Sequence, residues 1–222
     1  MADTTTPATE SSGEDDDVVV LPWWQHPVNI LTMLVAVALI GGMIGWLIGQ
    51  SDDSGPPSNA ADVGFLQDMR VHHDQAIEMA NLYLDRPDID GSLGTIARGI
   101  AYGQSIEIGI MVQLLNDLDA PPLSDDGMAM AWMGMAVPAE DMPGMATEDE
   151  MVALGDAEGA AANELFVRLM VAHHEGGIDM MDAALANAEN PTVLFYAQRW
   201  RDAQVVEVSE METQLARATA PD

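Results

Sequence analysis

The sequence predicts an all-α protein in which a four-helix bundle, made of two repeated helical hairpins, follows one transmembrane helix. Three observations predict this fold. A 22-residue segment near the N-terminus carries no charge. The rest of the chain has apolar residues at helical spacing and lacks the alternating pattern of β-strands. Finally, a set of residues recurs about 100 positions later, which indicates a duplicated unit.

The N-terminal part is predicted to be an acidic tail followed by a membrane anchor. Residues 1–27 are rich in Thr, Ser, Glu and Asp, and we expect this tail to be disordered. The anchor, residues 28–50, includes the uncharged run Val28–Gly49, which as a helix spans roughly 33 Å at ~1.5 Å per residue. A cleaved signal peptide is the alternative, but the tail has no positive charge and no small-x-small cleavage site follows at once. Neither flank carries Lys or Arg, so charge leaves the orientation in the membrane open.

A polar linker, residues 51–61, leads to the first predicted hairpin, residues 62–119. Its first helix is expected to extend from about Asp62 to Leu84. The second helix is expected to begin near Ser92, because serine commonly caps helix N-termini. The hairpin ends before a Pro-Pro pair, which does not continue a helix.

A methionine-rich connection, residues 120–156, separates the two hairpins. Of the 17 methionines in the chain, seven fall between Met128 and Met151. Thr147 and Glu150 have the spacing of a capping box, which predicts a short helix near the end of the connection.

The second hairpin, residues 157–217, repeats the first. Its last helix is expected to begin with Asn190 as the cap and Pro191 in the first turn, where the missing N–H of proline costs nothing. Two such hairpins form a bundle with pseudo-twofold symmetry. Phe65, Met69, His72, His73, Ile77 and Met79 recur 101 positions later as Phe166, Met170, His173, His174, Ile178 and Met180. Ala97, Gln104, Glu107 and Met111 recur 100 positions later as Ala197, Gln204, Glu207 and Met211.

The recurring His and Met residues are predicted to share one face of their helices. At ~100° per residue, each Met-x-x-His-His motif and its following Met fall within an arc of roughly 120°. On the partner helix, a glutamine, a carboxylate and another thioether are also predicted to share one face. Imidazole and thioether donors favour copper, and thioethers select Cu(I) over zinc and hard cations. The candidate metal ligands are Met69, His72, His73, Met79, Glu107, Met111, Met170, His173, His174, Met180, Glu207 and Met211.

Several alternatives remain at the level of sequence. Buried Met and His residues are also ordinary core residues. Glu107 and Glu207 either bind the metal or orient a histidine that does. The methionine-rich connection either binds a soft cation or only packs or is disordered. The two motifs form either separate sites or a single site across the pseudo-twofold axis.

The composition excludes some classes of function. The 37 acidic residues outnumber the seven basic ones and give a formal charge of −30, so nucleic acid is not an expected partner. Cysteine is absent, which excludes disulfides, thiolate nucleophiles and sulfur-based zinc sites.

These motifs resemble the family called domain of unknown function 305 over most of Gly64–Leu215. The resemblance implies a ferritin-like fold and an exported or periplasmic protein, and therefore a single-pass membrane protein with an extracytoplasmic C-terminal domain. It also implies copper binding, since some members are described as copper-binding proteins involved in copper tolerance. The chain departs from the family in having Gly176-Gly177 where Gly-Ala is preferred. The shared motifs are Met69-x-x-His72-His73 with Ala76, Ile77 and Met79, then Gln104-x-x-Glu107, Met142-Pro-Gly-Met145 and Met170-x-x-His173-His174.

We therefore predict a membrane-anchored protein for copper sequestration, delivery or tolerance that has no catalytic turnover. Its expected partners are the membrane, copper ions and a copper-receiving or respiratory membrane protein. A structural accessory subunit of a membrane complex is one alternative. A ferritin-like di-iron or di-manganese oxidase is another, but such sites use Glu three residues before a histidine. Here those positions hold Met69 and Met170.

Overall fold

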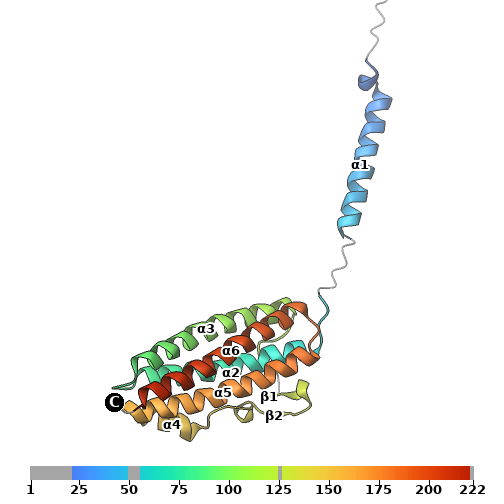
Figure 1. The fold of residues 1–222 in the computed structure, drawn as a ribbon. Helices are drawn as coiled ribbons and strands as arrows, with labels where there is room; N and C mark the ends of the chain where they lie inside the picture. The colour runs from blue at the N-terminus through green and yellow to red at the C-terminus, as the bar shows by residue number, and fades with distance from the viewer. Residues whose placement is uncertain (1–21, 50–55, 125–126, 221–222) are drawn as a thin grey trace, which may run out of the picture. The chain divides into compact units, whose positions relative to one another are not determined.

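The computed structural model describes residues 22–49, 56–124 and 127–220, in two compact units that divide after Asp53 (Figure 1). In the first unit a short 3-10 helix, η1 (Trp23–Gln25), precedes the long helix α1 (Pro27–Gly49). By length and composition, α1 is apolar enough to cross a membrane, and its large apolar side chains from Val28 to Leu47 are exposed. The acidic tail predicted to be disordered lies mostly outside the described residues.

The second unit is a four-helix bundle made of two helical hairpins, as the sequence predicts. Helix α2 pairs with α3 in the first hairpin and α5 pairs with α6 in the second, and α2 and α5 pack against each other between them (Figure 1). A shorter helix, α4, precedes the second hairpin. The helices are α2 (Ala60–Leu84), α3 (Gly91–Asp117), α4 (Glu148–Asp156), α5 (Gly159–Asn187) and α6 (Pro191–Ala218).

The helix starts follow the capping rules, with one correction. Asn190 caps α6 by accepting from two backbone N–H groups, with Pro191 next to it, and Thr147 forms the predicted capping box with Glu150. The prediction that Ser92 caps the second helix is wrong. Asp90 is the cap instead, because its carboxylate accepts from the N–H groups of Ser92 and Leu93 and starts the helix earlier.

Helices α2 and α5 run antiparallel, and buried polar contacts hold both ends of the pair. At the start of α2, the buried Asp62 carboxylate accepts from the backbone N–H of Asn190, 2.9 Å away, just beyond α5. At the other end, Tyr83 stacks on Phe166 with ring centroids 4.2 Å apart and donates to Asn163 Oδ1. This pairing fixes the register between the two helices, and their middle turns carry the histidine motifs.

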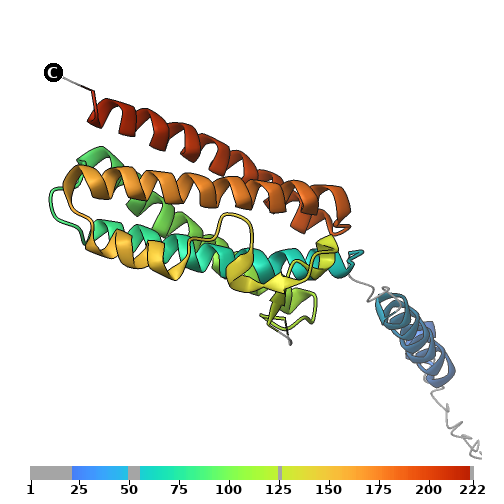
Figure 2. The same ribbon diagram turned by 90° about the horizontal axis from the view of Figure 1, so that it is seen from below.

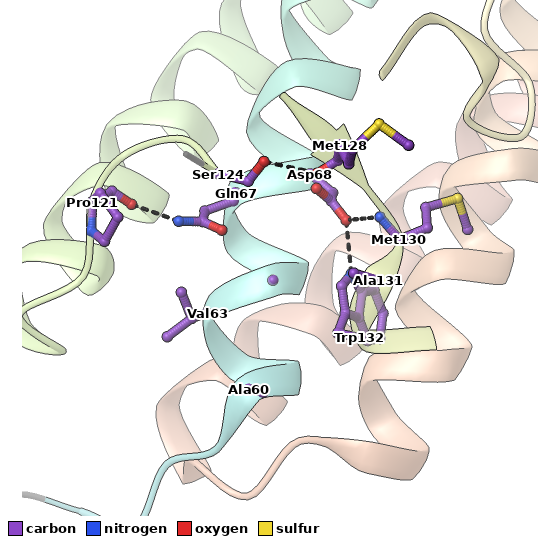
Figure 3. Close-up of a pocket in the computed structure, with 11 residues that line it drawn as sticks. Ala60, Val63, Gln67, Asp68, Pro121, Ser124, Met128, Met130, Ala131 and Trp132 are labelled. Carbon is purple, nitrogen blue, oxygen red and sulfur yellow. Dashed lines mark hydrogen bonds between the residues drawn. The ribbon is translucent and has the colours of Figure 1, made fainter. Parts of the chain in front are cut away.

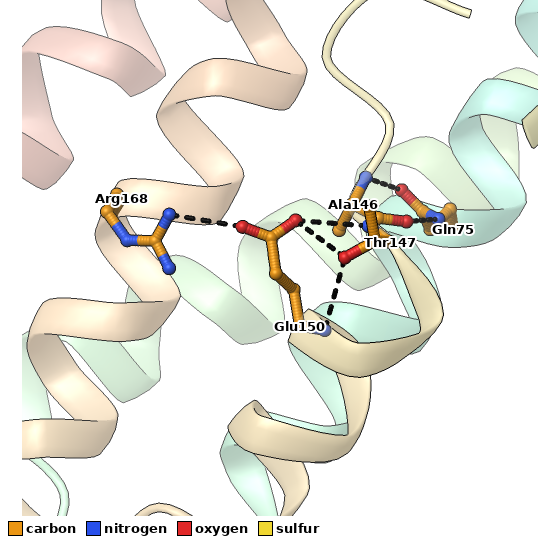
Figure 4. Close-up of polar contacts among 5 residues, drawn as sticks. All are labelled: Gln75, Ala146, Thr147, Glu150 and Arg168. Carbon is orange, nitrogen blue, oxygen red and sulfur yellow. Dashed lines mark hydrogen bonds and ion pairs between the residues drawn. The ribbon is translucent and has the colours of Figure 1, made fainter. Parts of the chain in front are cut away.

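The methionine-rich connection lies along α2 and α5 (Figure 2). No strand was predicted here, but two-residue strands form an antiparallel pair, which is too short to produce an alternating sequence pattern. The end of the connection is held by the side-chain amide of Gln75, which bonds to both backbone groups of Ala146, and by Arg168, which pairs with Glu150 (Figure 4). Its elements are β1 (Met128–Ala129), η2 (Ala131–Met133), β2 (Val137–Pro138) and η3 (Ala139–Asp141).

Candidate metal centre

Four histidines from α2 and α5 lie together in the middle of the bundle. All four are fully buried. The rings of His72 and His173, one from each helix, are 3.7 Å apart between centroids and tilted by 31°. The two Met-x-x-His-His motifs therefore meet across the pseudo-twofold axis. This settles a point that the sequence leaves open, because the meeting depends on the register of α2 against α5.

The outer histidine of each pair contacts a glutamate of its hairpin partner helix. His73 Nε2 is 2.7 Å from Glu107 Oε2, and His174 Nε2 is 2.8 Å from Glu207 Oε2. An ionised carboxylate only accepts hydrogen bonds, so Nε2 must carry the proton. In the neutral ring, Nδ1 then keeps its lone pair, and in both residues this atom is buried without a hydrogen-bond partner. The glutamates thus fix the tautomer of both rings and leave each Nδ1 available as a nitrogen donor.

The inner histidines are held in the neutral form by their surroundings. Burial, with a smaller effect of the neighbouring His73, lowers the pKa of His72 to about 3. Burial and the nearby His72 also lower the pKa of His173 well below its usual value. His72 donates from Nε2 to the backbone oxygen of Pro143, 3.1 Å away. Neutral imidazoles are the form that binds metal ions, so both rings are ready to act as ligands at neutral pH.

In the described part of the chain, the buried polar side-chain atoms without a hydrogen-bond partner lie in this centre. Nine buried side-chain nitrogen and oxygen atoms have no hydrogen-bond partner there. Each such atom costs about 1–3 kcal/mol, and native proteins contain few of them. A cluster of this size in one place indicates a bound group that satisfies them, and nitrogen donors with buried lone pairs fit a metal ion. The atoms belong to His72, His73, His173, His174, Gln104 and Gln204.

Gln104 and Gln204 were not among the predicted ligands, although both recur in the repeat and lie on the predicted face. Gln204 packs over Gly177, where an added Cβ would lie 2.7 Å from its Oε1 and 3.2 Å from Cε1 of His72. The glutamine amide and the imidazole therefore meet at Gly177. Gly177 occupies the position that Ala76 has in the first half, so the two halves of the centre differ here.

The predicted methionine ligands are all buried, and they form two groups on either side of the histidines. Because α2 and α5 are antiparallel, each group mixes residues from both hairpins. The two groups belong to two separate hydrophobic clusters. We call them methionine layer A, which contains Met69, Met111 and Met180, and methionine layer B, which contains Met79, Met170 and Met211.

Among the residues that the structure describes, no three His, Cys, Asp or Glu side chains are arranged as a group that would hold a metal ion. The four histidines bring nitrogen donors together in pairs, and the remaining donors available are the thioethers and the glutamine amides. A metal ion in this centre would therefore take methionine ligands as well, which selects soft cations.

A segment of the methionine-rich connection covers the centre from one side. The carbonyl oxygen of Pro143 accepts from His72, and Gly144 has φ +80°. An added Cβ at Gly144 would lie 2.8 Å from Cα of His173, and one at Gly176 would overlap the Pro143 carbonyl. The glycines on both sides of this contact allow the backbone of the connection to lie directly on α5.

Comparisons with known proteins place the bundle in a recognised group. The family model described as Domain of unknown function (DUF305) matches residues 62–215. No curated protein matches the chain. A DUF305 protein from Streptomyces coelicolor, described as secreted, is 36% identical with a TM-score of 0.66, covering 73% of this chain and 96% of that one.

Two further solved structures have the same fold. A DUF305 fragment from Deinococcus radiodurans is 28% identical with a TM-score of 0.61, covering 73% of this chain and 99% of that one. The protein CopM in its Cu(II)-bound form is 25% identical with a TM-score of 0.51, covering 70% of this chain and 96% of that one. CopM has also been solved in Cu(I)-bound and Ag-bound forms.

Proposed function

The chain belongs to the DUF305 family, and from this premise we propose that it is a membrane-anchored, extracytoplasmic copper-binding protein. Its cargo is copper, with Cu(I) favoured, and its role is copper sequestration, delivery or tolerance. The copper ion is bound and passed on, without catalytic turnover.

One observation carries the proposal. Nine buried polar atoms without partners gather in four histidines and two glutamines, and six buried methionines flank them. The neutral imidazoles supply nitrogen donors, and the thioethers supply soft donors that favour Cu(I). The relatives support the choice of metal, since CopM is described in Cu(I)-, Cu(II)- and Ag-bound forms.

The proposed location rests on α1 and on a relative. Helix α1 has the length and composition of a membrane-spanning segment. The DUF305 protein of Streptomyces coelicolor is described as secreted, which supports placing the bundle outside the cytoplasm. A copper-receiving or respiratory membrane protein is the partner that this location suits.

The contacts of the glutamates disfavour the oxidase alternative. Carboxylate-bridged di-metal sites need several carboxylates facing a shared centre. Glu107 and Glu207 each contact one histidine and are partly exposed, with 21% and 30% of the side chain accessible. The accessory-subunit alternative has no specific observation in its favour.

The test is an anaerobic Cu(I) titration of the full chain in detergent against a competing chelator. The double variant His72→Leu/His173→Leu removes two donors. An apolar side chain of similar size replaces each imidazole, and only the bond from His72 to the Pro143 carbonyl is lost, so folding should be retained. We expect the variant to lose about tenfold or more in Cu(I) affinity. The matched control is His26→Leu, which changes the histidine outside the bundle and should bind as the wild type does.

The proposal is wrong if the wild type binds Cu(I) as weakly as the double variant. A second variant, Met69→Leu/Met170→Leu, keeps the core volume and removes two thioethers. It should lower Cu(I) affinity while leaving Zn(II) affinity nearly unchanged, and equal losses for both ions would exclude thioether ligation.

A further inference from the structure

Three methionines of the connection, Met128, Met130 and Met142, lie outside the centre described above but next to it. We propose that their thioethers form a separate acquisition site for a soft monovalent cation, Cu(I) or Ag(I). The site takes the ion from solution and passes it to methionine layer A. This inference rests on the proposed function, and it adds an entry site and a direction of loading.

The backbone of Met130 is held in a strained conformation. Its φ is +63°, in the left-handed region, which long side chains rarely adopt and which costs about 1–2 kcal/mol. Its N–H donates to Asp68 Oδ2 at 2.7 Å, and its carbonyl accepts from the N–H groups of Met133 and Met135. These bonds keep a methionine where glycine would be less strained. The result is a thioether side chain that points inward and is 1% exposed.

Met128 and Met142 line the same pocket, of about 230 Å³, against α2. Their approach follows from the β1–β2 pairing, which places Met128 opposite Pro138, four residues before Met142. Met128 is partly exposed and Met142 is 2% exposed. Figure 3 shows the side chains of Met128 and Met130 extending in the same direction from the connection. One methionine of the three is therefore partly exposed, and the other two lie inside.

The site is continuous with one methionine layer only. Met130 and Met142 belong to the same buried cluster as layer A. The cluster that contains layer B includes one methionine from the connection, the half-buried Met151 on α4. Thioethers thus extend from the surface to layer A, and the same series is lacking on the side of layer B within the described residues. This asymmetry gives the direction of loading.

A fixed carboxylate and a fixed indole complete the site. Asp68 lines the pocket shared by Met128 and Met142, and it also lines a larger one, of about 560 Å³, with Met128, Met130 and Trp132. It accepts from Nε1 of Trp132 at 2.8 Å (Figure 3). The indole lies against Gly64, where an added Cβ would overlap the ring. The carboxylate attracts a cation, and the indole lines the same pocket as Met128 and Met130.

The test compares Ag(I) loading of the full chain in detergent between the wild type and the variant Met128→Leu/Met130→Leu/Met142→Leu. Ag(I) is an air-stable soft probe, and leucine keeps the packing volume while removing the thioether. We expect the triple variant to bind one ion fewer and to load the remaining sites about tenfold more slowly, with their affinity unchanged. Met151→Leu is the matched control and should leave both the number of ions and the rate as in the wild type.

The outcomes separate the two proposals. If the triple variant binds as many ions at the same rate as the wild type, the acquisition site is wrong and the proposed function stands. If the wild type binds no Ag(I), the proposed function itself fails. Should the triple variant not fold, Met130→Gly removes one thioether and also relieves the positive φ. The same loss of one ion and slower loading are expected for it, and unchanged loading overturns the inference.

Discussion

The two inner imidazole rings of this bundle, those of His72 and His173, are kept in the neutral form and make few hydrogen bonds. His72 bonds only through Nε2 to Pro143, and neither nitrogen of His173 has a partner. Unpaired polar atoms destabilise a folded protein, and they persist where the fold serves a ligand. The same lone pairs that cost stability without metal become bonds when a cation enters.

The stability of the metal-free protein should therefore fall with acidification. The folded-state pKa of His72 is about 3, below the unfolded value near 6.5, and the pKa of His173 is also lowered. Between these values the unfolded chain binds protons that the folded chain does not, so stability falls as pH decreases. The expected loss is about 1.4 kcal/mol per pH unit for each histidine.

Urea unfolding of chelator-treated protein between pH 7 and pH 5 measures this loss. In this range the variant His72→Leu/His173→Leu should have a much flatter profile, because it lacks both groups. A wild-type profile as flat as that of the variant would contradict the prediction.

The glutamates should act on copper affinity through the histidines that they contact. Glu107→Gln replaces a carboxylate by an amide that also donates, so the proton of His73 is no longer confined to Nε2. We expect Cu(I) affinity to fall about 10–100-fold. Nitrogen chemical shifts of the histidine rings report the tautomer directly, and they should change in Glu107→Gln. The exposed Glu78→Gln, on α2, is the matched control, and an affinity loss without a tautomer change would indicate that Glu107 is itself a ligand.

At the scale of elements, the connection and α5 touch backbone to backbone over the histidines. Gly144 and Gly176 allow this contact, and Gly177 leaves room for Gln204. The consecutive glycines of α5 thus serve different neighbours. One accommodates a fixed carbonyl and the other the end of a flexible side chain.

Alanine substitutions at the two glycines should have unequal effects. Gly176→Ala overlaps the Pro143 carbonyl, so the connection must move, and we expect a loss of about 1–3 kcal/mol in stability. Gly177→Ala meets Gln204 Oε1, which can rotate away, and it gains up to about 1 kcal/mol in helix propensity. Its stability should stay close to that of the wild type. Urea unfolding of the three proteins measures the difference, and equal destabilisation by both substitutions would contradict it.

The spacing of residues within each segment was enough to predict the helices and the helix faces that carry the His and Met residues. The spacing of Met69, His72 and His73 predicted a single shared face, and Asn190 with Pro191 predicted the start of α6. Both predictions depend on residues within one helix, where sequence spacing sets geometry.

The joining of the two motifs in one centre could not be predicted, since it depends on contacts between helices. Nothing near His72 in the sequence indicates that its ring meets His173, because the meeting follows from the register of α2 against α5. The contact of His72 with Pro143 is made by a backbone carbonyl, so no side chain in the sequence indicates it. Gln104 and Gln204 did give a signal, their recurrence, but glutamine is an uncommon metal ligand and its burial was not evident.

At the scale of the whole molecule, the surface is strongly acidic. The formal charge is −30, and only seven basic residues offset 37 acidic ones. In the described residues the ion pairs made by arginine are largely exposed, such as Arg201 with Asp182 and Arg168 with Glu150. Such pairs contribute little, so repulsion among carboxylates opposes folding at low ionic strength.

Added salt should therefore stabilise the protein. Between about 20 mM and 0.5 M NaCl the Debye length shortens several-fold, and we expect the melting temperature to rise by a few degrees. Thermal unfolding followed by circular dichroism gives the value. Choline chloride at equal ionic strength should act alike, because screening does not depend on the cation, and a melting temperature that falls with salt would contradict the prediction.

Each methionine layer draws residues from both halves of the chain, with Met69 and Met111 from one hairpin meeting Met180 from the other. A protein consisting of one hairpin would contain no complete methionine layer. It would have to form a homodimer to build the same centre. A duplicated gene that encodes both hairpins in tandem makes this assembly independent of protein concentration. It also lets the two halves diverge, as Ala76 and Gly177 already have.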